Sequence, residues 1–262
     1  MDKVNALRNL LHTTIKLDSE LFKTIAALEA QYDSKFQEIY KKRKEILAGK
    51  AELTPEQKKW SYESLMVKDR QDQIEKNEAK HFWLECLKYA ENDIIFKVDY
   101  EILKHLIDVR YEYLENSGSE IPGFKLIFEF EKNEYFSNTE LTKTYYQSFD
   151  LDKDLPIDYE GPWICALEGC KINWNEGKDV TRRKSSKSKH SHNQSFFNFF
   201  RFNHVKITVE NAVNYQVDIE NGQFIKDELI PKAILFYTQE YDALASGSES
   251  DSDDMSDESG QE

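Results

Sequence analysis

The fold is decided by residues 4–48, VNALRNLLHTTIKLDSELFKTIAALEAQYDSKFQEIYKKRKEILA, a stretch that contains no proline or glycine. Its apolar residues recur at heptad spacing, and seven of them define a predicted helix–helix seam: Leu11, Leu21, Ile25, Leu28, Tyr32, Ile39 and Ile46. A helix of about 45 residues is about 65 Å long, which exceeds what one domain of this size can cover. We therefore predict a dimerisation helix over residues 1–48. The alternative is a helix that folds back on its own domain.

The chain after this helix is expected to begin with more helical structure. Thr54 and Pro55 have the residue types of a helix N-cap and first turn, which predicts an accessory helical segment over residues 49–78. A further helix is expected over residues 99–114, because apolar residues there recur at roughly helical spacing.

The pattern then changes to the two-residue period of strands. Phe124, Leu126, Phe128 and Phe130 alternate with polar residues, which predicts a half-buried strand paired with an antiparallel strand over residues 140–149. Residues 172–174 and 179–181 indicate another strand region, and residues 219–241 a helical stretch broken at Pro231. This order predicts an α+β domain over residues 79–242, with an antiparallel sheet packed by helices, and a disordered acidic tail over 243–262.

The charge of the chain limits its partners. The formal net charge is −14, and removing the seven acids of residues 246–262 still leaves −7. Such a field repels nucleic acid and attracts basic proteins. We therefore expect no direct specific binding of nucleic acid. In the tail, Ser246, Ser248 and Ser250 each precede an acidic residue by three positions, a pattern typical of sites for acid-directed kinases.

The sequence offers no pattern for catalysis. It contains no glycine-rich phosphate loop, no nucleophile elbow and no zinc-protease motif, and its three cysteines form no disulfide framework or metal spacing. We therefore expect no enzyme activity, no cofactor and no metal. With neither a signal peptide nor a long apolar run, a soluble intracellular protein without membrane association is expected.

A basic insertion over residues 181–194 contrasts with the acidic chain. Its positive charges are Arg182, Arg183, Lys184, Lys187 and Lys189. Short basic runs of this kind are typical of nuclear localisation signals, with a solvated loop as the alternative. The four phenylalanines that follow, in SFFNFF (195–200), are expected to return the chain to the core.

Four segments carry a family resemblance. They are NEYFSNTELTKTYY (133–146), GPWICALEGCKINWNEGKDVT (161–181), SFFNFF (195–200) and DIENGQFIKDELIPKAILFYTQEYD (218–242). In this order they resemble the nucleosome assembly protein family of histone chaperones, and its nucleosome-assembly-protein branch more than its SET branch. The resemblance implies a homodimer joined by the long helix, and an "earmuff" domain with an acidic surface.

The same resemblance implies a function. Family members bind the lateral histone dimer and also the central histone pair, and they promote nucleosome assembly without ATP. It implies a location in the nucleus and the cytoplasm, with nuclear import of the chain by an importin that recognises the basic insertion. The candidate histone-facing acids are Glu129, Glu131, Glu134, Asp150, Asp152, Asp154, Asp158 and Glu160. Two alternatives remain, an acidic enzyme inhibitor or adaptor of the SET type and a general chaperone for basic proteins.

Overall fold

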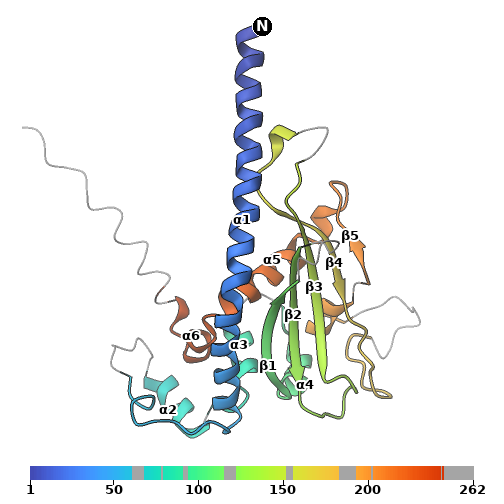
Figure 1. Cartoon of the computed structure of the whole chain (residues 1–262). Coiled ribbons are helices and arrows are strands. Elements are labelled where there is room, and N and C mark those ends of the chain that lie inside the picture. Colours follow the sequence, from blue (N-terminus) through green and yellow to red (C-terminus); the bar gives the residue numbers. More distant parts are fainter. Residues whose placement is uncertain are drawn as a thin grey trace, which may run out of the picture.

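The computed structural model consists of one long helix packed along an α+β domain, with a five-stranded antiparallel sheet at the centre of the domain (Figure 1). The structure describes residues 1–60, 68–77, 79–90, 94–114, 122–151, 156–182, 193–201, 203–242 and 244. The α+β class and the long N-terminal helix predicted from the sequence are confirmed.

Helices come first along the chain, the strands follow, and helices close the domain. The helices are α1 (Asp2–Leu47), α2 (Lys68–Asn77), α3 (Phe82–Tyr89), α4 (Tyr100–Leu103), α5 (Gln216–Phe224) and α6 (Ala233–Thr238). The strands are β1 (Leu106–Tyr113), β2 (Gly123–Phe130), β3 (Glu140–Ser148), β4 (Trp163–Gly169) and β5 (Val205–Lys206), paired in that order and all antiparallel. Single turns are η1 (Lys97–Asp99), η2 (Pro156–Asp158), η3 (Phe196–Phe200), η4 (Ala212–Asn214) and the π-helical η5 (Ile225–Leu229).

Helix α1 presents one face to its own domain and another to solvent. Ile15, Ser19 and Tyr40 are buried on the docked face, whereas the seam residues predicted from the sequence are exposed. The N-terminal turns of α1 project beyond the domain (Figure 1). One face of α1 therefore folds back on the domain, as the alternative reading expects. The predicted seam residues on the other face are exposed in the part of the chain that the structure describes, and self-association stays a prediction.

Polar contacts fix α1 against the edge of the sheet. The Gln37 side chain donates to the backbone oxygen of Tyr111 in edge strand β1, at 2.7 Å, and Ser19 donates to the Phe149 backbone oxygen, at 2.8 Å. The Arg43 guanidinium stacks between the rings of Tyr40 and Trp83 and donates to the backbone oxygen of Ile230. The Gln37 bond thus satisfies a backbone group of an edge strand, and the other two fix α1 to the segments that follow β3 and η5.

The structure corrects part of the predicted element order. The helix expected over residues 99–114 is wrong: only Tyr100–Leu103 is α-helical, and Leu106–Tyr113 forms β1. A bulge between Leu106 and Asp108 interrupts the two-residue alternation, which leaves Ile107 exposed and made the apolar spacing look helical. Residues 172–174 contribute one isolated bridge, between Trp174 and Phe136, and residues 179–181 contain no strand residue. The strand that follows β3 is β4.

The core lies between the inner face of the sheet and the helices. Phe124, Leu126, Phe128 and Phe130 of β2 are buried there, as the alternation predicted. All four phenylalanines of η3 are buried and pack against Phe128 and Phe130. Ser195 caps η3, and the buried Asp99 carboxylate accepts from the Ser195 hydroxyl at 2.6 Å and from the Phe196 N–H at 2.8 Å. The SFFNFF segment is therefore the packing anchor that the sequence indicated.

A buried ion pair joins β3 to α5. Lys143 is fully buried, and its ammonium donates to the Asp218 carboxylate at 2.8 Å and to the Phe199 backbone oxygen at 2.7 Å. The Tyr145 hydroxyl donates to the same carboxylate. Gly222 lies so close to the Tyr145 ring that an added Cβ would approach it to 2.2 Å. The glycine thus permits the close contact of helix and strand.

The C-terminal helical stretch is broken where the sequence predicted. Helix α5 continues into the π-helical η5, and α6 begins two residues after Pro231. Proline removes a backbone donor and cannot continue the preceding helix, which explains the break. Helix α6 then packs on α3, with the rings of Phe82 and Tyr237 stacked 4.8 Å apart.

Candidate functional site

The structure separates the predicted acidic residues into two groups. Glu129, Glu131 and Glu134 lie at the end of the sheet where β2 leads to β3, whereas Asp150, Asp158 and Glu160 lie beyond the opposite end of β3. A strand of eight or nine residues is about 27–30 Å long, so the two groups are too far apart to form one patch on the protomer. Asp152 and Asp154 lie outside the described residues.

The first group is largely neutralised by neighbouring cations. The Glu129 carboxylate is 2.6 Å from the Lys44 ammonium and 3.0 Å from the Arg110 guanidinium, and its side chain is only 22% exposed. Arg110 also contacts Glu140 at 2.6 Å, and Lys125 contacts Glu112 at 3.2 Å. Opposite charges on adjacent strands stabilise the sheet through such pairs. Glu129 is therefore a structural residue that fixes α1 to the sheet as well as a candidate acid.

The remaining two acids of this group are exposed but paired. The Glu131 carboxylate is 2.9 Å from Nδ1 of His105, and Glu134 contacts the Lys178 ammonium. The hydrogen bond from Lys178 holds the pKa of the Glu134 carboxyl below its usual value. A basic partner would have to displace the His105 hydrogen bond and compete with the Lys178 ammonium, which lowers the contribution that these acids make to binding.

The second group is open to solvent. Asp158 and Glu160 are exposed and make no ion pair with any described residue, and Asp150 is 87% exposed, 3.6 Å from Lys23. The loop that carries them is held against α1, where the rings of Phe22 and Tyr159 meet edge to face at 6.4 Å. These acids border a groove of about 1170 Å³ that also contains Trp163 and Glu210. Exposed, unpaired carboxylates attract cations at the lowest desolvation cost.

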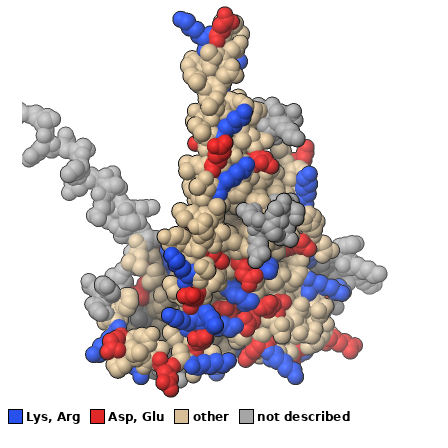
Figure 2. Space-filling view, in the orientation of Figure 1, with Lys and Arg blue, Asp and Glu red and all other residues tan. Residues whose placement is uncertain are grey.

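In Figure 2, blue and red side chains are interleaved over the lower part of the domain, where the β2–β3 end of the sheet lies, and charged side chains of both signs also lie at the tip and along the upper part of α1. The acidic character is therefore not uniform over this face. Sequence reasoning missed Glu112, which pairs with Lys125 of β2, and Glu140, which pairs with Arg110 of β1, because these cations come from other strands.

The exposed apolar face of α1 is the second candidate surface. All seven predicted seam residues are between 42% and 59% exposed, and Leu7 and Phe36 extend the same stripe. One helical turn repeats every 3.6 residues, so residues with this spacing share one face. An apolar stripe of this length on a monomeric protein is typical of a protein–protein interface.

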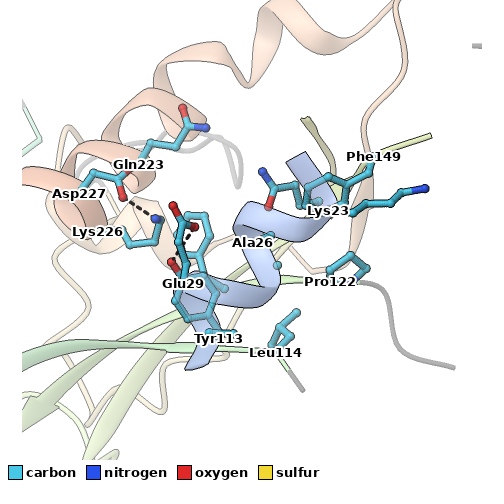
Figure 3. A pocket seen from close by; sticks show the side chains of 14 residues that line it. Lys23, Ala26, Glu29, Tyr113, Leu114, Pro122, Phe149, Gln223, Lys226 and Asp227 are labelled. Carbon is cyan, nitrogen blue, oxygen red and sulfur yellow. Dashed lines mark hydrogen bonds and ion pairs between the residues drawn. The ribbon is translucent and has the colours of Figure 1, made fainter. Parts of the chain in front are cut away.

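A pocket between α1 and the sheet carries its own charges. In Figure 3, Glu29 of α1 faces the Tyr113 hydroxyl, and Lys226 contacts Asp227. The Lys226 ammonium also lies 5.3 Å from the ring centroid of Phe124 and 5.6 Å from that of Tyr113. Cation–π contact and the neighbouring carboxylates already satisfy this lysine. The pocket is therefore an internally balanced part of the α1 packing rather than an open ligand site.

The basic insertion has a well-defined base. Asn193 donates its N–H to the Thr181 oxygen at 2.9 Å, and its side-chain amide donates to the Val180 oxygen, so the two ends of the insertion lie together. Arg182 is exposed there and contacts Asp179 at 3.0 Å. Arg183, Lys184, Lys187 and Lys189 lie outside the described residues, as do Ser246, Ser248 and Ser250.

The part of the chain that the structure describes offers no group of three or more His, Cys, Asp or Glu side chains that could hold a metal ion. In that same part, every helix is too short or too polar to cross a membrane.

Comparison with known proteins places these features in a family. A family profile described as nucleosome assembly protein (NAP) matches residues 2–240. Nucleosome assembly protein 1-like 1-A of Xenopus laevis is 31% identical over 271 residues, which cover 91% of this chain and 68% of the relative. Nucleosome assembly protein 1-like 4 of Homo sapiens is 28% identical, over 91% of this chain and 73% of the relative.

Solved structures with this fold agree. Nucleosome Assembly Protein 1 from Plasmodium knowlesi superposes with a TM-score of 0.59 at 24% identity, over 90% of this chain and 94% of that one. A nucleosome assembly protein from Plasmodium falciparum gives a TM-score of 0.54 at 24% identity, over 90% and 95%. At this identity the likeness establishes the fold, including the long helix and the sheet.

Proposed function

The chain belongs to the nucleosome assembly protein family, whose members are histone chaperones and not enzymes, and from this premise we propose that it binds core histones through its exposed carboxylates and promotes nucleosome assembly without ATP. The observation that carries the proposal is the family match over residues 2–240, which spans both α1 and the whole α+β domain. The open acids Asp150, Asp158 and Glu160 support it, because they are free to face a basic partner.

The proposed mechanism is electrostatic. Carboxylates on the chaperone occupy the cationic surface of a histone pair and so suppress disordered histone–DNA contacts. DNA has a far higher density of negative charge, so a correctly wrapped nucleosome remains the more stable state and the histones pass to it. No nucleotide is needed, in keeping with a sequence without a phosphate-binding loop. Both the lateral histone dimer and the central pair are proposed cargo.

The active unit in this proposal is a homodimer. The stripe on α1 spans Leu7 to Ile46 and is exposed in the protomer, so a second copy of α1 running antiparallel can cover it along its full length. Because the two α+β domains would then lie at opposite ends of the helix pair, each dimer presents two copies of every acidic group. Two sites on one partner bind with an increased effective concentration.

The proposed location is nucleus and cytoplasm, with the basic insertion as the import signal. Its paired base at Thr181 and Asn193 supports this reading, because it joins the two described ends of the insertion and leaves Arg182 exposed. The test replaces Arg182, Arg183, Lys184, Lys187 and Lys189 with alanine in a fluorescently tagged full-length chain. Loss of nuclear accumulation and of importin binding is expected. Unchanged accumulation would contradict the import role and leave the chaperone proposal intact.

Phosphorylation of the tail is a separate proposal. Each phosphate on Ser246, Ser248 or Ser250 would add about −1.5 to −2 charge to an already acidic segment. Mass spectrometry of the protein from its native cells is expected to find these sites occupied, and an unmodified tail would contradict the idea.

Histone selectivity is tested by competition. A fluorescently labelled lateral histone dimer is titrated with the full-length chain at physiological salt, in the presence of excess lysozyme or a basic ribosomal protein. The proposal predicts that histone binding persists, and that it weakens as salt rises because carboxylate–cation contacts are screened. Displacement by any basic competitor would instead indicate a general chaperone. The central histone pair is titrated in the same way.

A further inference from the structure

A groove at the end of the sheet combines exposed apolar side chains with unpaired acids. It has a volume of about 1170 Å³ and lies between the loop of residues 158–163 and the segment that follows β5. Trp163 on one wall is 44% exposed, and Val209 on the other is 91% exposed. The buried Ile207 also lines the groove. A tryptophan and a β-branched residue exposed in one concave site form an apolar patch that a partner can cover.

The border of the groove is strongly acidic. Among its lining residues, Asp150, Asp158, Glu160 and Glu210 are negative, and Lys206 is positive. Hydrogen bonds with Thr208 and with its own backbone hold the pKa of Glu210 below its usual value, so this carboxylate is ionised at neutral pH. Lys23 contacts Asp150 only at 3.6 Å and in an exposed position, where an ion pair contributes little.

The composition of the groove selects one occupant. Its acids repel the chain's own tail, because residues 246–262 contain seven acids and no lysine or arginine. The apolar stripe on α1 is a separate surface, and none of its seven seam residues lines the groove. A segment that fits must carry an apolar side chain for Trp163 and Val209 and cationic side chains for the surrounding carboxylates.

We propose that this groove binds a basic segment of the histone cargo by inserting one apolar side chain between Trp163 and Val209, with flanking lysines or arginines against Asp158, Glu160 and Glu210. This inference rests on the proposed function and adds a location and a mode of recognition. Buried aromatic anchors dominate the affinity of protein interfaces, whereas surrounding charges set the rate of association and the specificity. The acids alone would attract any basic surface. The apolar site between Trp163 and Val209 favours a basic segment that can insert an apolar side chain over one that cannot.

The two contributions have different salt dependence, which makes them separable. Burial of apolar area is insensitive to moderate salt, whereas carboxylate–cation attraction is screened. The combined change Trp163→Ala and Val209→Ser is therefore expected to weaken binding of the labelled lateral histone dimer about tenfold at both low and high salt. The combined change Asp158→Asn, Glu160→Gln and Glu210→Gln is expected to weaken binding at low salt and to match the parent chain at high salt.

The control replaces another exposed tryptophan. Trp60 is 74% exposed and lies in the segment that follows α1, away from the groove, so Trp60→Ala is expected to leave binding unchanged. All variants are measured as full-length chains, with circular dichroism and light scattering to verify the fold and the mass. A fall in mass for the Trp163 variant would show that the groove contacts a second copy, which would overturn the proposal.

A direct readout keeps the test independent of variant stability. The parent chain is labelled with 5-fluorotryptophan, and the Trp163 resonance is assigned by its loss in Trp163→Phe. Addition of the lateral histone dimer is expected to shift this resonance and leave that of Trp60 in place. The groove proposal is wrong if the parent chain binds histones, its Trp163 resonance does not shift, and the variant with Trp163→Ala and Val209→Ser binds histones as tightly as the parent. In that case the proposed chaperone function still stands. If the parent binds histones no better than lysozyme does, the proposed function itself has failed.

Discussion

Removing one partner of the buried Lys143–Asp218 pair should be far more costly than removing both. Lys143 is fully buried, and the Asp218 side chain is only 12% exposed. Burial lowers the pKa of Lys143, and the Asp218 carboxylate opposes that shift. In Asp218→Ala the ammonium loses its carboxylate partner and retains the hydrogen bond to the Phe199 backbone oxygen. An uncompensated buried charge of this kind costs about 3–5 kcal/mol of unfolding free energy.

The reverse changes define the coupling between the two residues. Lys143→Met leaves a carboxylate that still accepts from the Tyr145 hydroxyl at 3.1 Å, so a smaller loss of about 1–3 kcal/mol is expected. The double change Lys143→Met and Asp218→Leu removes both charges, and the Tyr145 hydroxyl keeps the Asp218 backbone oxygen as acceptor at 3.0 Å. Its stability should lie within about 1 kcal/mol of the parent, because buried pairs are often replaced by apolar residues without loss.

The assay is urea unfolding followed by circular dichroism at one protomer concentration, since dimerisation contributes to apparent stability. The control is Glu101→Ala, which breaks an exposed ion pair with Lys104 at 2.6 Å and should change the unfolding free energy little. In Asp218→Ala the pKa of Lys143 in the folded state lies below its value in the unfolded state. At pH values between these two pKa values, the unfolded state binds more protons than the folded state. The deficit of this variant should therefore shrink as pH rises toward 10.

Two outcomes would refute this reasoning. Asp218→Ala costing no more than Glu101→Ala would mean that the ammonium is not held by the carboxylate. Strict additivity of the two single changes in the double variant would mean that the residues are not coupled.

Three further predictions concern other parts of the molecule. The change Ile25→Glu with Leu28→Glu should reduce the light-scattering mass from that of a dimer toward a monomer, whereas Ala27→Glu, on a different face at the same level of α1, should not; a monomeric parent chain would contradict the role of the stripe. Burial raises the pKa of the Cys86 thiol far above its usual value, so Ellman's reagent at pH 8 should modify it only after unfolding, and rapid reaction in the native protein would show that the α3–α6 contact opens readily. Gly222→Ala should destabilise the domain by about 1–3 kcal/mol because its methyl group meets the Tyr145 ring, whereas a neutral effect would show that α5 can shift away from β3.

The sequence predicted those elements whose pattern is local and regular. The two-residue period of Phe124 to Phe130 predicted the interior strand β2, and a heptad pattern without proline or glycine predicted the long helix. Leu106–Tyr113 was mistaken for a helix because a bulge disrupts the alternation at Asp108. A bulge depends on how two strands pair, so the residue pattern of one strand alone does not reveal it.

The candidate site was harder to predict than the fold. Sequence reasoning selected acids by their density along the chain, which grouped Glu129 with Asp158 although they lie at opposite ends of the sheet. It could not show that Glu129 is paired with Lys44 and Arg110, because these cations come from α1 and β1. It also missed Glu210 and Trp163 as neighbours in one groove, since β4 and the segment after β5 meet only in the folded domain.

The proposed assembly of nucleosomes by this chain without ATP can be measured by plasmid supercoiling. Relaxed plasmid, topoisomerase and core histones at physiological salt are incubated with the full-length chain and no nucleotide, beside reactions that lack either the chain or the histones. The account predicts that negative supercoils accumulate only when both are present, and that micrococcal nuclease then releases nucleosome-length DNA. A plasmid that stays relaxed, with histones aggregated on the DNA as they are without the chain, would contradict it.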